Sequence, residues 1–90
     1  MSAEKVLTVP EHVMFRQVGE ETVILDLGTG TYFGLDAVGA RIWQLLSDGR
    51  SVSQVVATLL DEFDVAQEQL ESDVDSLVRE LVTRGLLQAR

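Results

Sequence analysis

Residues 23–36 read V-I-L-D-L-G-T-G-T-Y-F-G-L-D. On either side of the glycines, apolar, aromatic and β-branched residues form two short runs of the kind found in β-strands. The loop Gly28-Thr29-Gly30 has two residues that can take positive φ, as a tight hairpin requires. Asp36 is suited to be a helix N-cap, because its carboxylate can accept a hydrogen bond from a first-turn N–H. These features predict two antiparallel strands, the second at Thr31–Leu35, followed directly by a helix.

The residues before this stretch extend the sheet. Residues 13–18, V-M-F-R-Q-V, alternate with a period of two, and the turn Gly19-Glu20-Glu21 follows them. We therefore predict a three-stranded antiparallel β-meander. In its middle strand, one face carries Val23, Leu25 and Leu27, and the other carries Thr22, Ile24 and Asp26. Pro10, the only proline, is expected to mark where the ordered chain begins, so that about residues 12–88 of a single domain spanning residues 1–90 are ordered.

After Asp36 the hydrophobic period changes to about 3.6, which predicts three helices. The apolar stripes are Val38, Ile42, Leu45 and Leu46; Val52, Val55, Val56, Leu59, Leu60 and Phe63; and Leu70, Val74, Leu77, Val78, Leu81 and Val82. Gly49 and Gly85 are expected to end the first and third helices in the left-handed conformation. Ser51 with Gln54 forms a capping box, and Asp64 with Gln67 resembles a third cap. The apolar tail Leu86-Leu87 is expected to dock on the core. The predicted class is α+β, three strands and then three helices.

Composition excludes several classes of protein. The 90 residues carry 15 acidic and 7 basic side chains, a net charge of −8. This surface would repel the phosphates of nucleic acids and of anionic membranes. The sequence contains no cysteine, no signal peptide and no apolar run of the ~20 residues that a membrane span needs. We therefore expect a cytoplasmic protein that binds neither nucleic acid nor membrane.

No constellation of catalytic or metal-binding residues stands out. His12 is the only histidine, so a two-histidine metal site is impossible. Glu68, Glu71 and Asp75 share one helix face, which a solvated surface explains. The glycines of residues 28–30 lead into a strand, whereas a phosphate-binding loop leads into a helix. We predict no catalytic residue, no metal and no cofactor.

The strand Thr31–Leu35 is an edge in a simple meander. Proteins usually protect an edge with lysine, proline or an inward charge, and this strand has none of these. Another part of the chain or a second copy could cover it. An extended peptide could instead add itself as the next strand. The residues alone leave these alternatives open.

The sequence resembles the PqqD-like proteins. Residues 23–36 resemble a segment of the family in which Leu-Leu-Asp is followed by a glycine, an aromatic run and then Leu-Asn. This chain has Asp36 where the family usually has the asparagine. Gly39, Ile42 and Trp43 match the helix that follows. Residues 48–51, D-G-R-S, resemble its Asp-Gly-Arg turn. Residues 73–87 resemble its closing Asp-Val and Gly-Leu-Leu pattern. The likeness covers about residues 13–88.

This family is that of the RiPP recognition elements, winged helix-turn-helix domains that bind the leader of a ribosomally made precursor peptide. The resemblance implies that a leader pairs antiparallel with residues 31–35, in a groove beside a helix at about residues 67–84. A separate leader peptidase, cyclase or radical SAM enzyme would then act on the presented peptide. The peptide-binding residues so implied are Thr31, Tyr32, Phe33, Gly34, Leu35, Asp73, Leu77, Glu80, Leu81 and Arg84. Among these, we expect Tyr32 and Leu77 to form the pocket walls.

The aromatic third strand and Trp43 favour the stand-alone recognition proteins of lasso-peptide biosynthesis over those of pyrroloquinoline quinone synthesis. Other radical SAM pathways remain open. A winged-helix regulator of DNA is a further alternative, but residues 52–63 contain no lysine or arginine and carry Asp61 and Glu62. The chain could be a monomer, or a homodimer through the edge strand.

Overall fold

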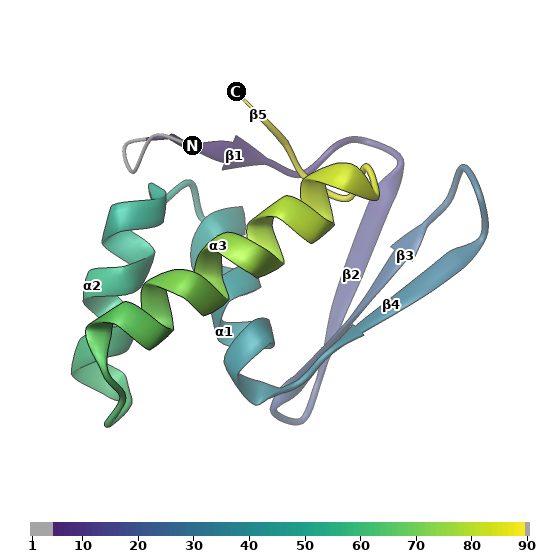
Figure 1. The fold of residues 1–90 in the computed structure, drawn as a ribbon. Coiled ribbons are helices and arrows are strands. Elements are labelled where there is room, and N and C mark those ends of the chain that lie inside the picture. Colours follow the sequence, from purple (N-terminus) through teal and green to yellow (C-terminus); the bar gives the residue numbers. More distant parts are fainter. Residues whose placement is uncertain (1–4, 90) are drawn as a thin grey trace.

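The computed structural model describes residues 5–89 (Figure 1). It contains three strands in one sheet, three helices, and a pair of two-residue strands formed by the two ends of this range. In chain order these are β1 (Leu7–Thr8), β2 (Val13–Val18), β3 (Glu21–Asp26), β4 (Thr31–Leu35), α1 (Ala37–Ser47), α2 (Val52–Glu62), α3 (Gln67–Thr83) and β5 (Gln88–Ala89). The predicted α+β order of three strands and then three helices is confirmed.

The meander has the order β2-β3-β4, with both pairs antiparallel. Gly19 takes φ 65° in the two-residue turn between Val18 and Glu21, as a hairpin turn with glycine first requires. Of the two glycines in the next loop, only Gly30 takes positive φ. Gly28, which is also free to take positive φ, does not do so. Its N–H instead donates to Oδ1 of the buried Asp26, at 2.8 Å.

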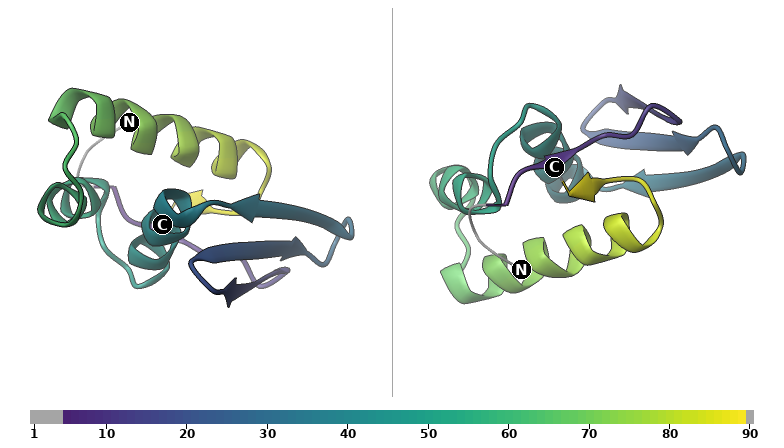
Figure 2. Two further views of the ribbon diagram at one scale, coloured as in Figure 1. Left: turned by 90° about the horizontal axis from the view of Figure 1, so that it is seen from below. Right: turned by 90° about the horizontal axis from the view of Figure 1, so that it is seen from above.

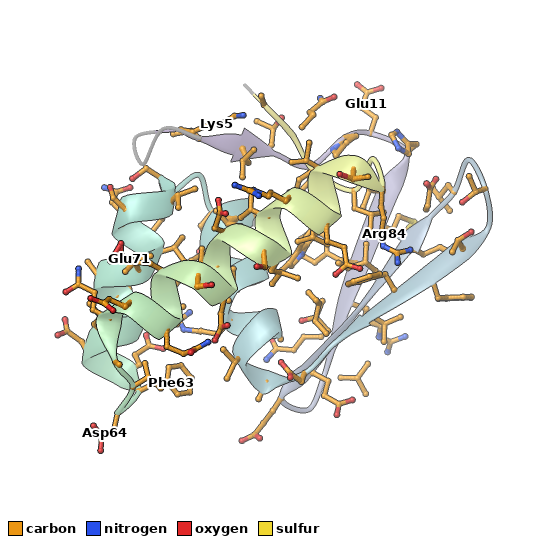
Figure 3. The ribbon with its side chains drawn as sticks, in the orientation of Figure 1. Lys5, Glu11, Phe63, Asp64, Glu71 and Arg84 are labelled. Atoms are coloured by element: carbon orange, nitrogen blue, oxygen red, sulfur yellow. The ribbon has the colours of Figure 1, made fainter. Side chains whose placement is uncertain are left out.

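Two of the three predicted helix caps are present. Asp36 accepts a hydrogen bond from the Gly39 N–H, and Ser51 and Gln54 form the reciprocal capping box. The third prediction is wrong, because the N-cap residue of α3 is Ala66, which makes no side-chain hydrogen bond to the helix. Figure 3 shows Asp64 pointing away from the body of the protein, at the bend between α2 and α3. The reason is that Asp64 lies two positions before the N-cap residue Ala66, so its carboxylate is not at the start of the helix.

The two ends of the described chain pair with each other. β1 and β5 are antiparallel, with Leu7 opposite Ala89 and Thr8 opposite Gln88. Leu7 is buried, so ordered structure begins before Pro10 and the expected start at about residue 12 is wrong. Leu86 and Leu87 are buried as predicted. A hydrophobic contact across the ends closes the core at this side, which local sequence patterns could not indicate.

One face of the sheet packs against the helices and the other is open (Figure 2). Ile24 and Leu35 lie on the buried face of the sheet. They belong to the same hydrophobic core as four helix residues, Trp43 and Leu46 of α1 and Val74 and Val78 of α3. The open face exposes Met14, Val18 and Tyr32, at 57%, 56% and 68% of their surface. Within the described range, no helix is both long enough and apolar enough to span a bilayer.

Candidate peptide-binding groove

The free edge of β4 presents the backbone of Tyr32 and Gly34. The closing pair of the two-residue β2–β3 turn, Val18 and Glu21, is a hydrogen-bonded pair. Along an antiparallel strand, successive residues direct their backbone N–H and C=O groups to opposite sides. Residues 22, 24 and 26 of β3 therefore bond to β4, where they lie opposite residues 35, 33 and 31. The N–H and C=O groups of Tyr32 and Gly34 therefore face away from β3. No other backbone group among residues 5–89 bonds to them.

A hollow of about 450 Å³ lies between this edge and α3. Phe33, Gly34 and Leu35 form one side, and Asp73 and Leu77 of α3 form the opposite side. The start of α1 closes the end of the hollow with Asp36, Val38, Gly39 and Ile42. Its lining combines the apolar side chains of Phe33, Leu77 and their neighbours with the carboxylates of Asp36 and Asp73. It can accept an apolar side chain of a segment that lies along β4.

A second hollow of about 200 Å³ continues along β4 toward the β3–β4 loop. It shares Phe33 with the first, and Thr31, Tyr32 and Arg84 also line it. The Arg84 guanidinium carbon lies 4.9 Å from the centre of the Phe33 ring, and its Nη2 lies 3.3 Å from Oε2 of Glu80. Figure 3 shows Arg84 reaching from the end of α3 toward the sheet. A cation stacked on an aromatic ring thus marks the middle of the groove.

The structure brings most of the expected residues into this groove and places the others elsewhere. Phe33, Gly34, Leu35, Asp73 and Leu77 line the first hollow; Thr31, Tyr32, Phe33 and Arg84 line the second. Glu80 lines neither and instead holds Arg84.

Two expectations about the groove are corrected. Leu81 is 0% exposed and belongs to the core, so it offers no surface to a peptide. Tyr32 and Leu77 do not face each other across one pocket. Tyr32 points to the open face of the sheet, since it alternates with the inward-facing Phe33, and it lines the second hollow, whereas Leu77 lines the first.

The contribution of α1 to the lining of the first hollow was not predicted from the sequence. Val38 was assigned to the buried stripe of the first helix, yet it is exposed and lines the first hollow with Gly39 and Ile42. A Cβ added at Gly39 would lie 3.3 Å from Leu35 Cδ2, so the glycine lets α1 approach the end of β4 closely. One feature of the sequence could have indicated this contribution of α1. No loop separates Leu35 from the N-cap Asp36, so the first turn of the helix lies beside the end of the strand.

The arrangement can accommodate an extended chain along the edge of β4. Within residues 5–89 no three histidine or acidic side chains are placed to hold a metal ion. His12 lies outside the groove, where its Nε2 is 3.2 Å from the carbonyl oxygen of Gly85.

Comparison with known proteins identifies the fold. The profile of the family described as coenzyme PQQ synthesis protein D (PqqD) matches residues 21–87. The chain belongs to the PqqD family. The matched range contains β3, β4 and the three helices, and therefore every residue that lines the groove. Among curated proteins, none matches the chain.

Two solved structures share this PqqD-like fold. TbiB1, in a structure described as a complex with the TbiA(β) leader peptide, is 38% identical, with a TM-score of 0.86 over 90% of this chain and 94% of its own. A lasso peptide synthetase B1, described as complexed with the leader peptide, is 29% identical, with a TM-score of 0.84 over 91% of this chain and 96% of its own.

Proposed function

We propose that this PqqD-family chain is a non-catalytic recognition element of lasso-peptide biosynthesis, which binds the leader of a precursor peptide and delivers it to a separate modifying enzyme. The observation that carries the proposal is the unpaired edge of β4 at Tyr32 and Gly34, lying beside a groove between this strand and α3. Both similar solved structures are described as complexes with leader peptides. This likeness supports a leader as the segment that completes the sheet, in preference to a peptide of the quinone pathway.

Backbone pairing by itself contributes little net affinity. Tyr32 and Gly34 offer four outward groups, each worth roughly 0.5–1.5 kcal/mol when bonded. Ordering a flexible leader costs about 2–5 kcal/mol, so the two terms nearly cancel. A buried large apolar side chain adds roughly 1.5–3 kcal/mol. Selectivity therefore depends on the leader side chains that enter the two hollows, and two or three of them bring the dissociation constant to about micromolar or below.

The test is calorimetry of the chain with a synthetic leader of a lasso-peptide precursor from the same genome, and with a scrambled leader as the control. We expect saturable binding of the native leader only. Amide NMR spectra should place the largest shifts at Tyr32 and Gly34 of β4. Absence of binding, or shifts confined to other elements, would contradict the proposal.

A further inference from the structure

Gly34 is the only glycine within the three strands of the sheet. Neither its backbone conformation nor its packing requires a glycine. Its φ is not positive, and a Cβ added to it would have nothing within 4 Å, its neighbours in sequence aside. A glycine inside a strand costs stability and often marks a site where a ligand or another backbone approaches closely. The space beside Gly34 is therefore open to a bound partner.

The open face of the sheet is apolar next to this glycine. Side chains alternate between the two faces of a strand, so Tyr32 and Gly34 belong to the open face. Leu25 and Val23 of β3 lie opposite them and are half-buried. A hollow of about 400 Å³ lies on this face, and its lining includes Val23, Leu25, Tyr32 and Arg16. Because Gly34 has no side chain, the open face has a gap between Val23 and the free edge of β4.

Tyr32 connects this face with the groove between β4 and α3. It lines both the hollow on the open face and the second hollow beside β4. A strand added antiparallel to β4 directs its side chains alternately to the two faces of the sheet. Its residues opposite Phe33 and Leu35 face the groove, whereas its residues opposite Tyr32 and Gly34 lie on the open face. Every second side chain of a bound leader therefore meets the open face.

The other edge of the sheet lacks such a gap. By the same alternation, the outward backbone groups of β2 belong to Phe15 and Gln17, and no other backbone group among the described residues bonds to them. β2 contains no glycine, and on the open face it carries Met14, Arg16 and Val18. Of the two edges, β4 is therefore the one that combines free backbone groups with a gap in the open face.

We infer that the leader residue opposite Gly34 is aromatic, and that its ring lies over this glycine and packs against Val23. The inference rests on the proposed function. Two strand spacings of about 4.8 Å separate that residue from Val23, so its side chain has to be long, and it has to be flat to cross a glycine backbone. Aromatic residues have this shape and cover glycines on neighbouring strands in this way.

The charge beside Val23 also favours an aromatic ring. Arg16 lies opposite Val23 on β2, and it makes no ion pair with any residue between 5 and 89. A free guanidinium group is attracted to the face of an aromatic ring, and an aliphatic side chain offers no such interaction. The leader is thus recognised on both faces of the added strand.

The methyl groups of Val23 give a direct test. The probe is the synthetic leader of a lasso-peptide precursor from the same genome, added to the methyl-labelled chain. A ring shifts the resonances of the methyl groups that it covers, so we expect the Val23 signals to shift. Those of Val18, on the same face but on β2, should stay in place. Nuclear Overhauser contacts from Gly34 Hα should identify an aromatic leader residue. Unmoved Val23 signals in leader-saturated chain, or a non-aromatic contact residue, would overturn the inference.

Variants separate this side-chain contact from backbone pairing. Gly34→Val keeps both outward backbone groups and adds a side chain that suits a strand, but it occupies the space of the ring. It should weaken binding of the native leader about three- to tenfold. A leader with alanine at the contact residue should bind Gly34→Val at least as well as it binds the wild type. Val23→Thr should weaken binding of the native leader about twofold, whereas Val18→Thr, the same change on the same face, should not.

Two results with the variants would overturn the inference: wild-type affinity of Gly34→Val for the native leader, or equal losses in Val23→Thr and Val18→Thr. Thermal unfolding shows whether each variant is folded, and Gly34→Val should be at least as stable as the wild type. Failure of the wild type to bind leader counts against the proposed function. Leader binding that is insensitive to the side chains at positions 23 and 34 counts against this inference alone.

Discussion

The two edges of the sheet differ in what lies beside them. β4 faces α3 across a groove with exposed residues at its rim and a stacked Arg84–Phe33 pair at its centre. β2 faces α1, and there the hollow is lined by three aromatic residues, Phe15, Trp43 and Phe63. Both edges present two residues with unpaired outward backbone groups. The two edges therefore offer the same backbone groups in different side-chain surroundings.

The largest expected effect is the loss of leader binding when a proline is placed in the edge strand β4. Gly34→Pro removes an outward N–H of β4 and fills the space that the incoming strand needs, while edge positions tolerate proline within the fold. We expect leader binding to fall below detection in calorimetry, with the helical circular dichroism unchanged.

The matched substitution at the other edge is Gln17→Pro, and leader affinity should remain at the wild-type value. Equal loss in both variants would show that the two edges are not independent. An unchanged constant for Gly34→Pro would refute pairing of the leader with β4.

The next effect concerns the side chains that line the first hollow. Leu77→Ala removes part of its wall, and loss of a partly buried leucine side chain should weaken leader binding about tenfold. Leu60→Ala is the control, since Leu60 is a half-buried leucine of α2 that lines neither hollow at β4. Isothermal calorimetry measures both. A larger loss for Leu60→Ala would place the binding pocket elsewhere.

A smaller effect is expected at the cation of the groove. Arg84→Met removes the charge stacked on Phe33, and since exposed charge pairs contribute up to about 1 kcal/mol, leader affinity should fall about two- to fivefold and depend less on salt. Arg79→Met is matched to it, because both arginines pair with an acidic residue four positions earlier on α3. If Arg79→Met has the same effect, the loss reflects net charge and not the position of Arg84.

The smallest effect is a dependence of folding stability on pH, which comes from the ion pair between Arg41 of α1 and Glu62 of α2. Hydrogen bonds from Arg41 lower the pKa of Glu62 below its ordinary value of 4.5. A carboxyl group whose pKa is lowered by folding stabilises the folded protein at a pH above the ordinary pKa of 4.5. This stabilisation is lost as the pH falls from that value through the lower pKa of the folded state.

Thermal unfolding between neutral and acidic pH should therefore show a slightly smaller acid-induced drop for Glu62→Gln than for the wild type. Asp61→Asn, at an exposed neighbouring position that forms no ion pair with residues 5–89, is the control. Identical drops for Glu62→Gln and the wild type would mean that the ion pair does not contribute in solution.

Local chemistry determined much of this protein. The alternation of residues 13–18, the glycine turns and the caps at Asp36 and Ser51 specify elements whose bonds close within a few residues, so they could be read from the sequence. The edge position of Thr31–Leu35 followed from the meander order alone. Most of the groove residues, which the family resemblance implied, line one of the two hollows beside β4.

Tertiary packing decided the rest. The middle strand buries Thr22, Ile24 and Asp26 and leaves the more apolar Val23 and Leu25 only half covered, because the side on which α1 packs determines which face is buried. The pairing of β1 with β5 joins residues about 80 positions apart, and the exposure of Val38 depends on how closely Gly39 lets α1 approach Leu35. Contacts between distant segments depend on the assembled shape of the chain, and no periodicity within a single segment encodes that shape.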